Sequence, residues 1–305
     1  MTKHILIGES RESWLSTYEN YLTKVLGVAP ATRTSYLLIA GRFLNHLSRD
    51  GNIDRSMFTT SAIIEFVAAD AAPRKGQGPG TTIAATRSFL RFLISQGIVS
   101  SHVETIIPHM WRPRHAALPD RLNESEIKKV LQFADDGTKK GIRNFALVLL
   151  FARLGLRADE AARLSLDDID WVNGHILIRA GKTRRERKLP LSQDLAEALL
   201  RYLRRSRGRS KYREVFVQAD APYHPYKAGS IGKIVTRLLN RAGIFRSSCG
   251  PHLFRHTLAS SMVNHGATFK EIADVLGHQA LMTTAVYAKL DLNTLAKIAL
   301  PWPRG

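Results

Sequence analysis

The stretch Pro251-His252-Leu253-Phe254-Arg255-His256 contains the residues on which the interpretation of the whole chain depends. Pro251 fixes a backbone angle that suits the first turn of a helix, and His252 and Arg255 then lie one turn apart on the same face. Two further pieces follow, Gly277-His278 and, nine residues after that histidine, Tyr287. Two histidines, an arginine and a tyrosine at fixed spacings form a candidate active site.

Capping signals predict how these pieces are separated. Thr268 and Glu271 have the spacing of a capping box, which predicts the start of a short helix. Gly277 suits the position just after a helix C-terminus. We therefore expect His278 to lie just beyond the end of that helix.

The composition favours a polyanionic partner. The chain has 305 residues, enough for two domains, and a formal net charge of +19. Most of the basic excess lies in residues 98–305, together with the motif. Nucleic acid is favoured over a membrane surface because no basic amphipathic anchor helix stands out. A solvated basic surface is the alternative.

The remaining composition indicates a cytoplasmic protein. Cys249 is the only cysteine, so an internal disulfide is excluded, and a reducing compartment fits. No zinc-ligand spacing surrounds it, and we expect no metal. No apolar run is long enough to cross a bilayer, and the first residues do not form a signal peptide.

Residues 1–97 are predicted to form a helical domain, because apolar residues recur there with the helical period. Arg87 and Arg91 lie four residues apart on its last helix, away from the apolar face, and are candidates for phosphate contacts. A role in solubility alone is an equally favoured alternative. Residues 98–116, rich in proline and basic side chains, are predicted to be an extended linker. A second domain, residues 117–305, follows.

The second domain is predicted to be mixed. Asn123 and Glu126 have capping-box spacing, and the apolar run Phe145–Leu154 predicts a buried helix that leads through a glycine to Arg157. Asn173-Gly174 predicts a type I′ turn between two strands, and a second turn at 181–185 leads to a third strand. The fold class is therefore mainly α with a small antiparallel β-sheet. The basic run 201–213 is predicted to be a DNA-facing or solvated loop.

Together these motifs resemble the tyrosine recombinase (phage integrase) family. The pieces that match are His252 to His256, the Leu-Gly-His ending at His278, and Tyr287 nine residues later. Gly155-Leu156-Arg157 with Glu160 matches the motif T-G-L-R-x-x-E-L, although neighbouring positions of that motif differ. The resemblance implies an α+β catalytic domain over 117–305 and, by arrangement alone, a helical, SAM-like core-binding domain over 1–97.

The resemblance implies breakage and rejoining of double-stranded DNA through a 3′-phosphotyrosyl intermediate, without metal or cofactor. Tyr287 would attack phosphorus. Arg157 and Arg255 would hold the two non-bridging oxygens, because a guanidinium binds two oxygens at once and stays protonated. Glu160 would orient the site; an ordinary helix acid beside Arg163 is the alternative.

Three further residues would handle protons and hydrogen bonds. His252 is the candidate base, His278 a donor to a phosphate oxygen, and Lys182 the general acid for the departing 5′ oxygen. Arg184 and Arg185 crowd the same turn as Lys182 and are predicted to contact DNA. Taken singly, His278 could instead be a helix cap, and Tyr287 a core residue.

The resemblance also implies that the apolar tail after Tyr287, residues 288–300, joins copies of the chain into a homotetramer on DNA, as two dimers at synapsed sites; packing on its own domain is the alternative. The function favoured first is a site-specific recombinase or integrase for integration, excision or transposition of a mobile element. A chromosome-dimer resolvase comes second. A type IB topoisomerase-like enzyme and a catalytically silent DNA-binding relative stay open.

Overall fold

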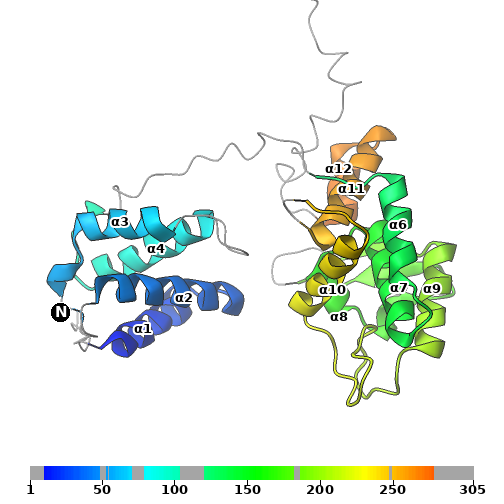
Figure 1. Cartoon of the computed structure of the whole chain (residues 1–305), viewed down its shortest axis with the longest axis horizontal. Helices are drawn as coiled ribbons and strands as arrows, with labels where there is room; N and C mark the ends of the chain where they lie inside the picture. Colours follow the sequence, from blue (N-terminus) through cyan, green and yellow to red (C-terminus); the bar gives the residue numbers. More distant parts are fainter. Residues whose placement is uncertain are drawn as a thin grey trace, which may run out of the picture. The chain divides into compact units, whose positions relative to one another are not determined.

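The computed structural model describes residues 10–48, 53, 55–70, 79–103, 120–181, 186–246 and 249–277. The chain divides into two compact units, Met1–Arg112 and Pro113–Gly305 (Figure 1). The division falls inside the stretch predicted to be a linker. Among the described helices, none combines the length and the apolar character needed to span a membrane.

The described part of the first unit is helical, as predicted. Its elements are α1 (Arg11–Asn20), η1 (Tyr21–Val25), α2 (Pro30–Leu47), η2 (Arg55–Met57), α3 (Thr60–Asp70) and α4 (Pro79–Ser95). Aromatic rings fill the core between them. Tyr18 of α1 meets Phe89 of α4 edge-on at 4.9 Å between ring centroids, and Phe89 in turn meets Phe43 of α2 at 6.0 Å. The apolar periodicity of the sequence therefore corresponds to one shared aromatic core.

Asp70 supplies a buried charge to this unit. It ends α3, and its carboxylate accepts a hydrogen bond from the Thr82 hydroxyl of α4 at 3.2 Å. The same carboxylate lies 3.2 Å from the Arg42 guanidinium of α2. Asp70 thus joins three helices that follow one another in the chain.

The second unit combines helices with one small sheet. Its helical elements are α6 (Glu124–Ala134), α7 (Lys139–Leu154), α8 (Ala158–Arg163), η3 (Leu166–Asp168), α9 (Gln193–Arg205), α10 (Ala228–Arg241), α11 (Pro251–Asn264) and α12 (Phe269–Leu276). Its strands β1 (Ile169–Asp170), β2 (His175–Ile178) and β3 (Arg187–Pro190) pair antiparallel in sequence order. The fold-class prediction is confirmed.

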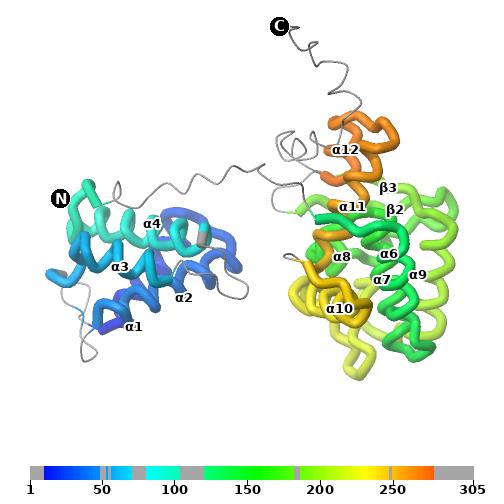
Figure 2. The backbone as a smooth tube through the Cα atoms, turned by 45° about the horizontal axis from the view of Figure 1, so that its top comes forward, coloured from blue at the N-terminus to red at the C-terminus, as the bar shows by residue number. Residues whose placement is uncertain are grey.

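Helix α7 is the centre of this unit. The apolar run predicted to be a buried helix is buried from Ala146 to Phe151, and α7 packs against α6, α9 and α11 (Figure 2). Gly155 ends the helix in the left-handed conformation, with φ +57°. A Cβ there would lie 2.9 Å from the Leu258 side chain, so both the backbone angle and the close packing favour glycine.

The predicted capping boxes are confirmed, and the predicted type I′ turn is wrong. Asn123 caps α6, and Thr268 caps α12, each with its glutamate partner. The four residues 171–174 join β1 to β2, and Asn173 lacks the positive φ that a type I′ turn requires. The reason is Asp170, whose carboxylate accepts hydrogen bonds from the backbone amides of Val172 and Asn173 and closes a wider turn.

Candidate active site

The described residues include three of the six predicted catalytic residues: Arg157, His252 and Arg255. Outside the described residues lie the predictions for Lys182, His278, Tyr287, Arg184, Arg185 and the tail 288–300. The site is therefore built from the three described side chains and their surroundings.

Arg255 joins the ends of two helices. It lies in the second turn of α11 and is only 3% exposed. Its two terminal nitrogens donate to the carbonyl oxygens of Gly155, 2.9 Å away, and Leu276, 2.5 Å away. Carbonyls at a helix C-terminus lack partners within the helix and carry partial negative charge, so a guanidinium is well suited to both.

Arg157 converges on the same place. It follows Gly155 by two residues, and its guanidinium donates to the Leu276 carbonyl at 3.3 Å and to Glu160 at 3.4 Å. The two arginines that the sequence analysis paired thus meet at one carbonyl. That carbonyl belongs to the last residue of α12, two positions before His278 in sequence.

Glu160 is the anionic centre of the cluster. Its side chain is 1% exposed, and its carboxylate accepts hydrogen bonds from the Arg157 backbone amide at 2.9 Å and from Arg187 at 3.0 and 3.2 Å. Burial opposes ionisation, but the hydrogen bonds and charge of Arg187, aided by Arg157, outweigh it and hold the pKa of Glu160 below its ordinary value. Arg163, considered as a partner from the sequence, pairs with Asp159 instead.

Arg187 was missed as a site residue. It lies on β3 with a side chain only 8% exposed, and its Nε donates to the Val275 carbonyl of α12 at 2.8 Å. In sequence it stands among several basic residues, so its charge gave no signal. The strand period does give one, because Arg187 shares a face of β3 with the buried Leu189.

The two histidines of α11 occupy different environments. His252 lies on the first turn of α11 and is exposed, although the buried Arg255 is only one turn away. His256 lies one turn after His252 and is half-buried. Burial, followed by the charges of His252 and Arg255, lowers the pKa of His256 below its ordinary value. His256 therefore binds a proton less readily than an ordinary imidazole, whereas His252 is the histidine that a ligand can reach.

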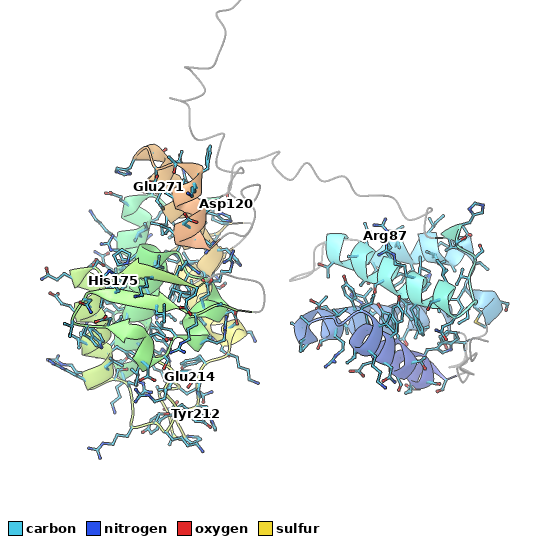
Figure 3. All side chains as sticks on the ribbon, turned by 180° about the vertical axis from the view of Figure 1, so that it is seen from behind. Arg87, Asp120, His175, Tyr212, Glu214 and Glu271 are labelled. Atoms are coloured by element: carbon cyan, nitrogen blue, oxygen red, sulfur yellow. The ribbon has the colours of Figure 1, made fainter. Side chains whose placement is uncertain are left out.

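The predicted DNA contacts of the first unit lie on α4. Arg87 is half-buried there (Figure 3), and Arg91 is exposed one turn further along.

The described residues hold no group of three or more histidine, cysteine or acidic side chains arranged to bind a metal.

The basic run 201–213 matches the predicted loop only in part: after α9 it continues as a loop in which Arg209, Lys211 and Arg213 are exposed. Its first residues belong to α9, and three arginines bind within the unit. Arg201 pairs with Asp135, Arg213 pairs with Asp167, and Arg207 donates to three backbone carbonyls. Arg207 is therefore held within the fold, since a guanidinium can satisfy several acceptors at once, whereas Arg213 remains exposed while it pairs with Asp167.

Comparison with known proteins identifies the family. The model of the phage integrase family matches residues 120–293, which is more than half of the chain. A putative integrase/recombinase, y4rA of Sinorhizobium fredii (strain NBRC 101917 / NGR234), is 36% identical over 293 residues, 96% of this chain and 71% of that protein. Tyrosine recombinase XerC of Lacticaseibacillus casei (strain BL23) is 26% identical over 92% of this chain and 95% of its own. The chain belongs to the phage integrase family of tyrosine recombinases.

Solved structures share the fold at low sequence identity. The XerH site-specific recombinase bound to its difH substrate has a TM-score of 0.70 at 22% identity, covering 95% of this chain and 85% of its own. A lambda integrase dimer bound to a core site has a TM-score of 0.70 at 17% identity, covering 90% and 94%. The Tn1549 transposon integrase has a TM-score of 0.69 at 16% identity, covering 94% and 100%.

Proposed function

We propose that this protein is a site-specific DNA recombinase that cuts and rejoins double-stranded DNA through a 3′-phosphotyrosyl intermediate. The observation that carries the proposal is the convergence of Arg157 and Arg255 on the Leu276 carbonyl. This contact gathers two guanidinium groups at the point where the chain continues to His278. Membership of the tyrosine recombinase family supports the proposal.

In the proposed reaction, the Tyr287 hydroxyl attacks the scissile phosphorus and loses its proton to a base, for which His252 is the candidate. The bond between phosphorus and the 5′ oxygen breaks, and Lys182 gives that oxygen a proton. The products are a 3′-phosphotyrosine and a free 5′-hydroxyl. Since the phosphodiester energy is retained in the covalent bond, attack by a 5′-hydroxyl of a second duplex restores DNA without ATP.

Arg157 and Arg255 would neutralise the charge that grows on the non-bridging oxygens. The burial of Arg255 supports this role, because a charge acts more strongly where water is excluded. The hydrogen bonds to helix-end carbonyls support it too, since donors that are already oriented need no reorganisation when the transition state forms. His278 would donate to one of the same oxygens.

The proposed partner is double-stranded DNA, held by the core-binding domain 1–97 and the catalytic domain 117–305 with the linker 98–116 between them. Arg87 and Arg91 on α4 would contact phosphates, as would Arg184 and Arg185. The tail 288–300 would join four copies into a homotetramer. This work on DNA would take place in the cytoplasm.

The proposed biological role is integration, excision or transposition of a mobile element. It is supported by relatives named putative integrase/recombinase, of which y4rA is 36% and y4rF 33% identical to this chain. Sequencing the DNA junctions that the protein forms in cells tests this role and supplies the site. Junctions at the ends of a mobile element are expected; junctions confined to one chromosomal site would favour dimer resolution instead.

The chemistry is tested by Tyr287→Phe, which removes one oxygen and little packing. The substrate is a duplex that carries the identified site and a nick near the scissile bond. Cleavage releases a short fragment from this duplex, so the protein stays covalently attached to the DNA. The covalent complex is then detected on a denaturing gel. We expect a trapped adduct with the wild-type protein, none with Tyr287→Phe, and equal DNA binding by both in a gel shift. An adduct of equal yield in the variant would contradict the assignment of Tyr287.

A further inference from the structure

We propose that Arg187 is a positioning residue for DNA cleavage, holding the phosphate-binding arginine Arg157 and the chain segment leading to His278 in one arrangement. The inference rests on the proposed function, because it assigns Arg187 a role in that reaction. Arg187 would not touch DNA. It would act through Glu160 and the C-terminal end of α12.

The contacts of Arg187 use the whole guanidinium. The two terminal nitrogens donate to the two carboxylate oxygens of Glu160, at 3.2 and 3.0 Å, and Nε donates to the Val275 carbonyl at 2.8 Å. Glu160 in turn accepts from the backbone and side chain of Arg157. A planar fork with fixed donors can serve both partners at once, which an ammonium group cannot do.

Arg187 also fixes the exit of the chain from α12. Gly277 ends that helix with φ +63°, and a Cβ built on it would lie 2.6 Å from Nη1 of Arg187. The guanidinium therefore lies directly against the Gly277 backbone. Because His278 is the next residue, the position of Arg187 limits where His278 can begin.

The place of Arg187 in the sheet extends this coupling to a third segment. Arg187 pairs with Ile178 across β2 and β3, at the end of the strand pair nearest in sequence to Lys182. One buried side chain thus connects the base of this hairpin, the segment of Arg157 and Glu160, and the end of α12. The side-chain contacts of Arg187 are with Glu160 and Val275, so its loss should affect the proposed phosphate-binding arginine Arg157 most directly.

Arg179 provides a matched control in the same sheet. It follows β2, and its guanidinium donates to the buried carboxylate of Asp168 at 2.5 Å, while its own side chain is 60% exposed. Both arginines therefore pair with a buried acid at the base of one hairpin. Arg187 differs in contacting Val275 and Gly277 of the α12 end.

The experiment compares Arg187→Gln, Arg187→Lys and Arg179→Gln in the full-length protein on the nicked duplex. Single-turnover cleavage, gel-shift affinity and thermal unfolding are measured for each. Since a displacement of about 1 Å costs about 100-fold in rate, we expect about a 100-fold loss of cleavage for Arg187→Gln with DNA affinity within about threefold of wild type. Arg187→Lys keeps the charge near Glu160 and should lose about tenfold, and Arg179→Gln about threefold or less.

Two substrate analogues separate positioning from general destabilisation. A methylphosphonate at the scissile position carries no negative charge, so the arrangement of the arginines matters less, and the defect of Arg187→Gln should fall to about tenfold or less. Sulfur at the bridging 5′ position leaves without a proton donor, so it should rescue Lys182→Ala but not Arg187→Gln. A variant that is merely unstable would show the same defect on all three substrates.

The inference is overturned if Arg187→Gln cleaves like wild type, or if its defect is unchanged on the methylphosphonate. If Arg187→Gln does not fold, Arg187→Lys decides the question, and full activity of that variant overturns the inference. The proposed function fails separately, when the wild-type protein itself forms no covalent adduct.

Discussion

Both units of the molecule contain buried carboxylates beside arginine, and two of them, Asp70 and Glu160, have different surroundings. Asp70 lies between Arg42 and Thr82, on helices that follow one another in the chain. Glu160 lies against Arg157 and Arg187, and both of these arginines also donate to carbonyls at the end of α12. Asp70 therefore joins neighbouring helices, whereas Glu160 joins segments far apart in sequence.

Burial of an ion pair therefore does not by itself show whether the pair serves stability or the reaction. Neutralising either carboxylate removes the counter-charge of an arginine that is at least partly buried, which is costly in both units. What distinguishes Glu160 is the second set of contacts made by its arginines. Those contacts reach the residues just before His278, so a defect at Glu160 should spread into the site.

The largest expected effect comes from Glu160→Gln and Asp70→Asn, which keep size and remove charge. Each should destabilise its own unit by about 3–5 kcal/mol, because one partner of a buried pair is lost. Cleavage should fall about 100-fold for Glu160→Gln, since Arg157 and Arg187 lose their anchor, and stay near wild type for Asp70→Asn. Amide hydrogen exchange, followed separately over α3–α4 and α8–α12, measures the stability of each unit.

A loss of cleavage in Asp70→Asn as large as that in Glu160→Gln, with both units folded by hydrogen exchange, would contradict this distinction between Asp70 and Glu160. The two buried pairs would then act alike on the reaction. Wild-type exchange over the unaltered unit serves as the internal control for each variant.

A smaller effect is expected from two glycines in the left-handed conformation. Gly27 in the first unit has φ +57° and open space around it, while Gly277 has φ +63° and the Arg187 guanidinium against it. Alanine should cost about 1–2 kcal/mol at either position, because the backbone angle is unfavourable for any side chain. Only Gly277→Ala should also slow cleavage, by about tenfold or more, as its methyl group displaces Arg187.

Thermal unfolding and the nicked-duplex assay measure the two effects side by side. Equal cleavage by Gly27→Ala and Gly277→Ala, at equal stability, would mean that the contact between Arg187 and Gly277 is unimportant. If only Gly277→Ala slowed cleavage, the reaction would depend on the backbone conformation at the C-terminal end of α12.

The parts of this fold that the sequence predicted are the parts with local signals. Helix starts at Asn123 and Thr268 were predicted from capping boxes, and the end at Gly277 from the requirement for a left-handed residue. The pairing of Arg157 with Arg255 was predicted from motif spacing by resemblance to the family. These signals depend on residues a few positions apart or on a known pattern.

The parts that escaped prediction depend on contacts over long sequence distances. Nothing near Arg187 in sequence indicates that Glu160 and Val275 surround it, because those residues come together only when β3 packs beside α8 and α12. The turn at Asn173-Gly174 was predicted wrongly because the Asp170 carboxylate changes its geometry. In the run 201–213, charge alone could not indicate which arginines pair with acids distant in sequence.

The smallest expected effect concerns the N-termini of one helix in each unit. Thr268 caps α12 in a full capping box, accepting from the Glu271 amide at 3.2 Å while Glu271 accepts from the Thr268 amide at 2.7 Å. Ser10 caps α1 with one hydrogen bond, from the Ser13 amide at 3.3 Å. Thr268→Ala should therefore cost about 1 kcal/mol, and Ser10→Ala about 0.5 kcal/mol, in the unfolding of the respective unit.

We expect the cleavage rate of Thr268→Ala to stay within about twofold of the wild-type rate. The lost cap lies at the N-terminus of α12, about 12 Å from the carbonyls of Val275 and Leu276 that the arginines bind. Those hydrogen bonds hold the last turn in place even when the first turn frays, because end fraying is a local event. If Thr268→Ala instead slowed cleavage as much as Arg187→Lys, the site would depend on the whole of α12 being formed. The arginine contacts at its C-terminal end would then be only one part of that dependence.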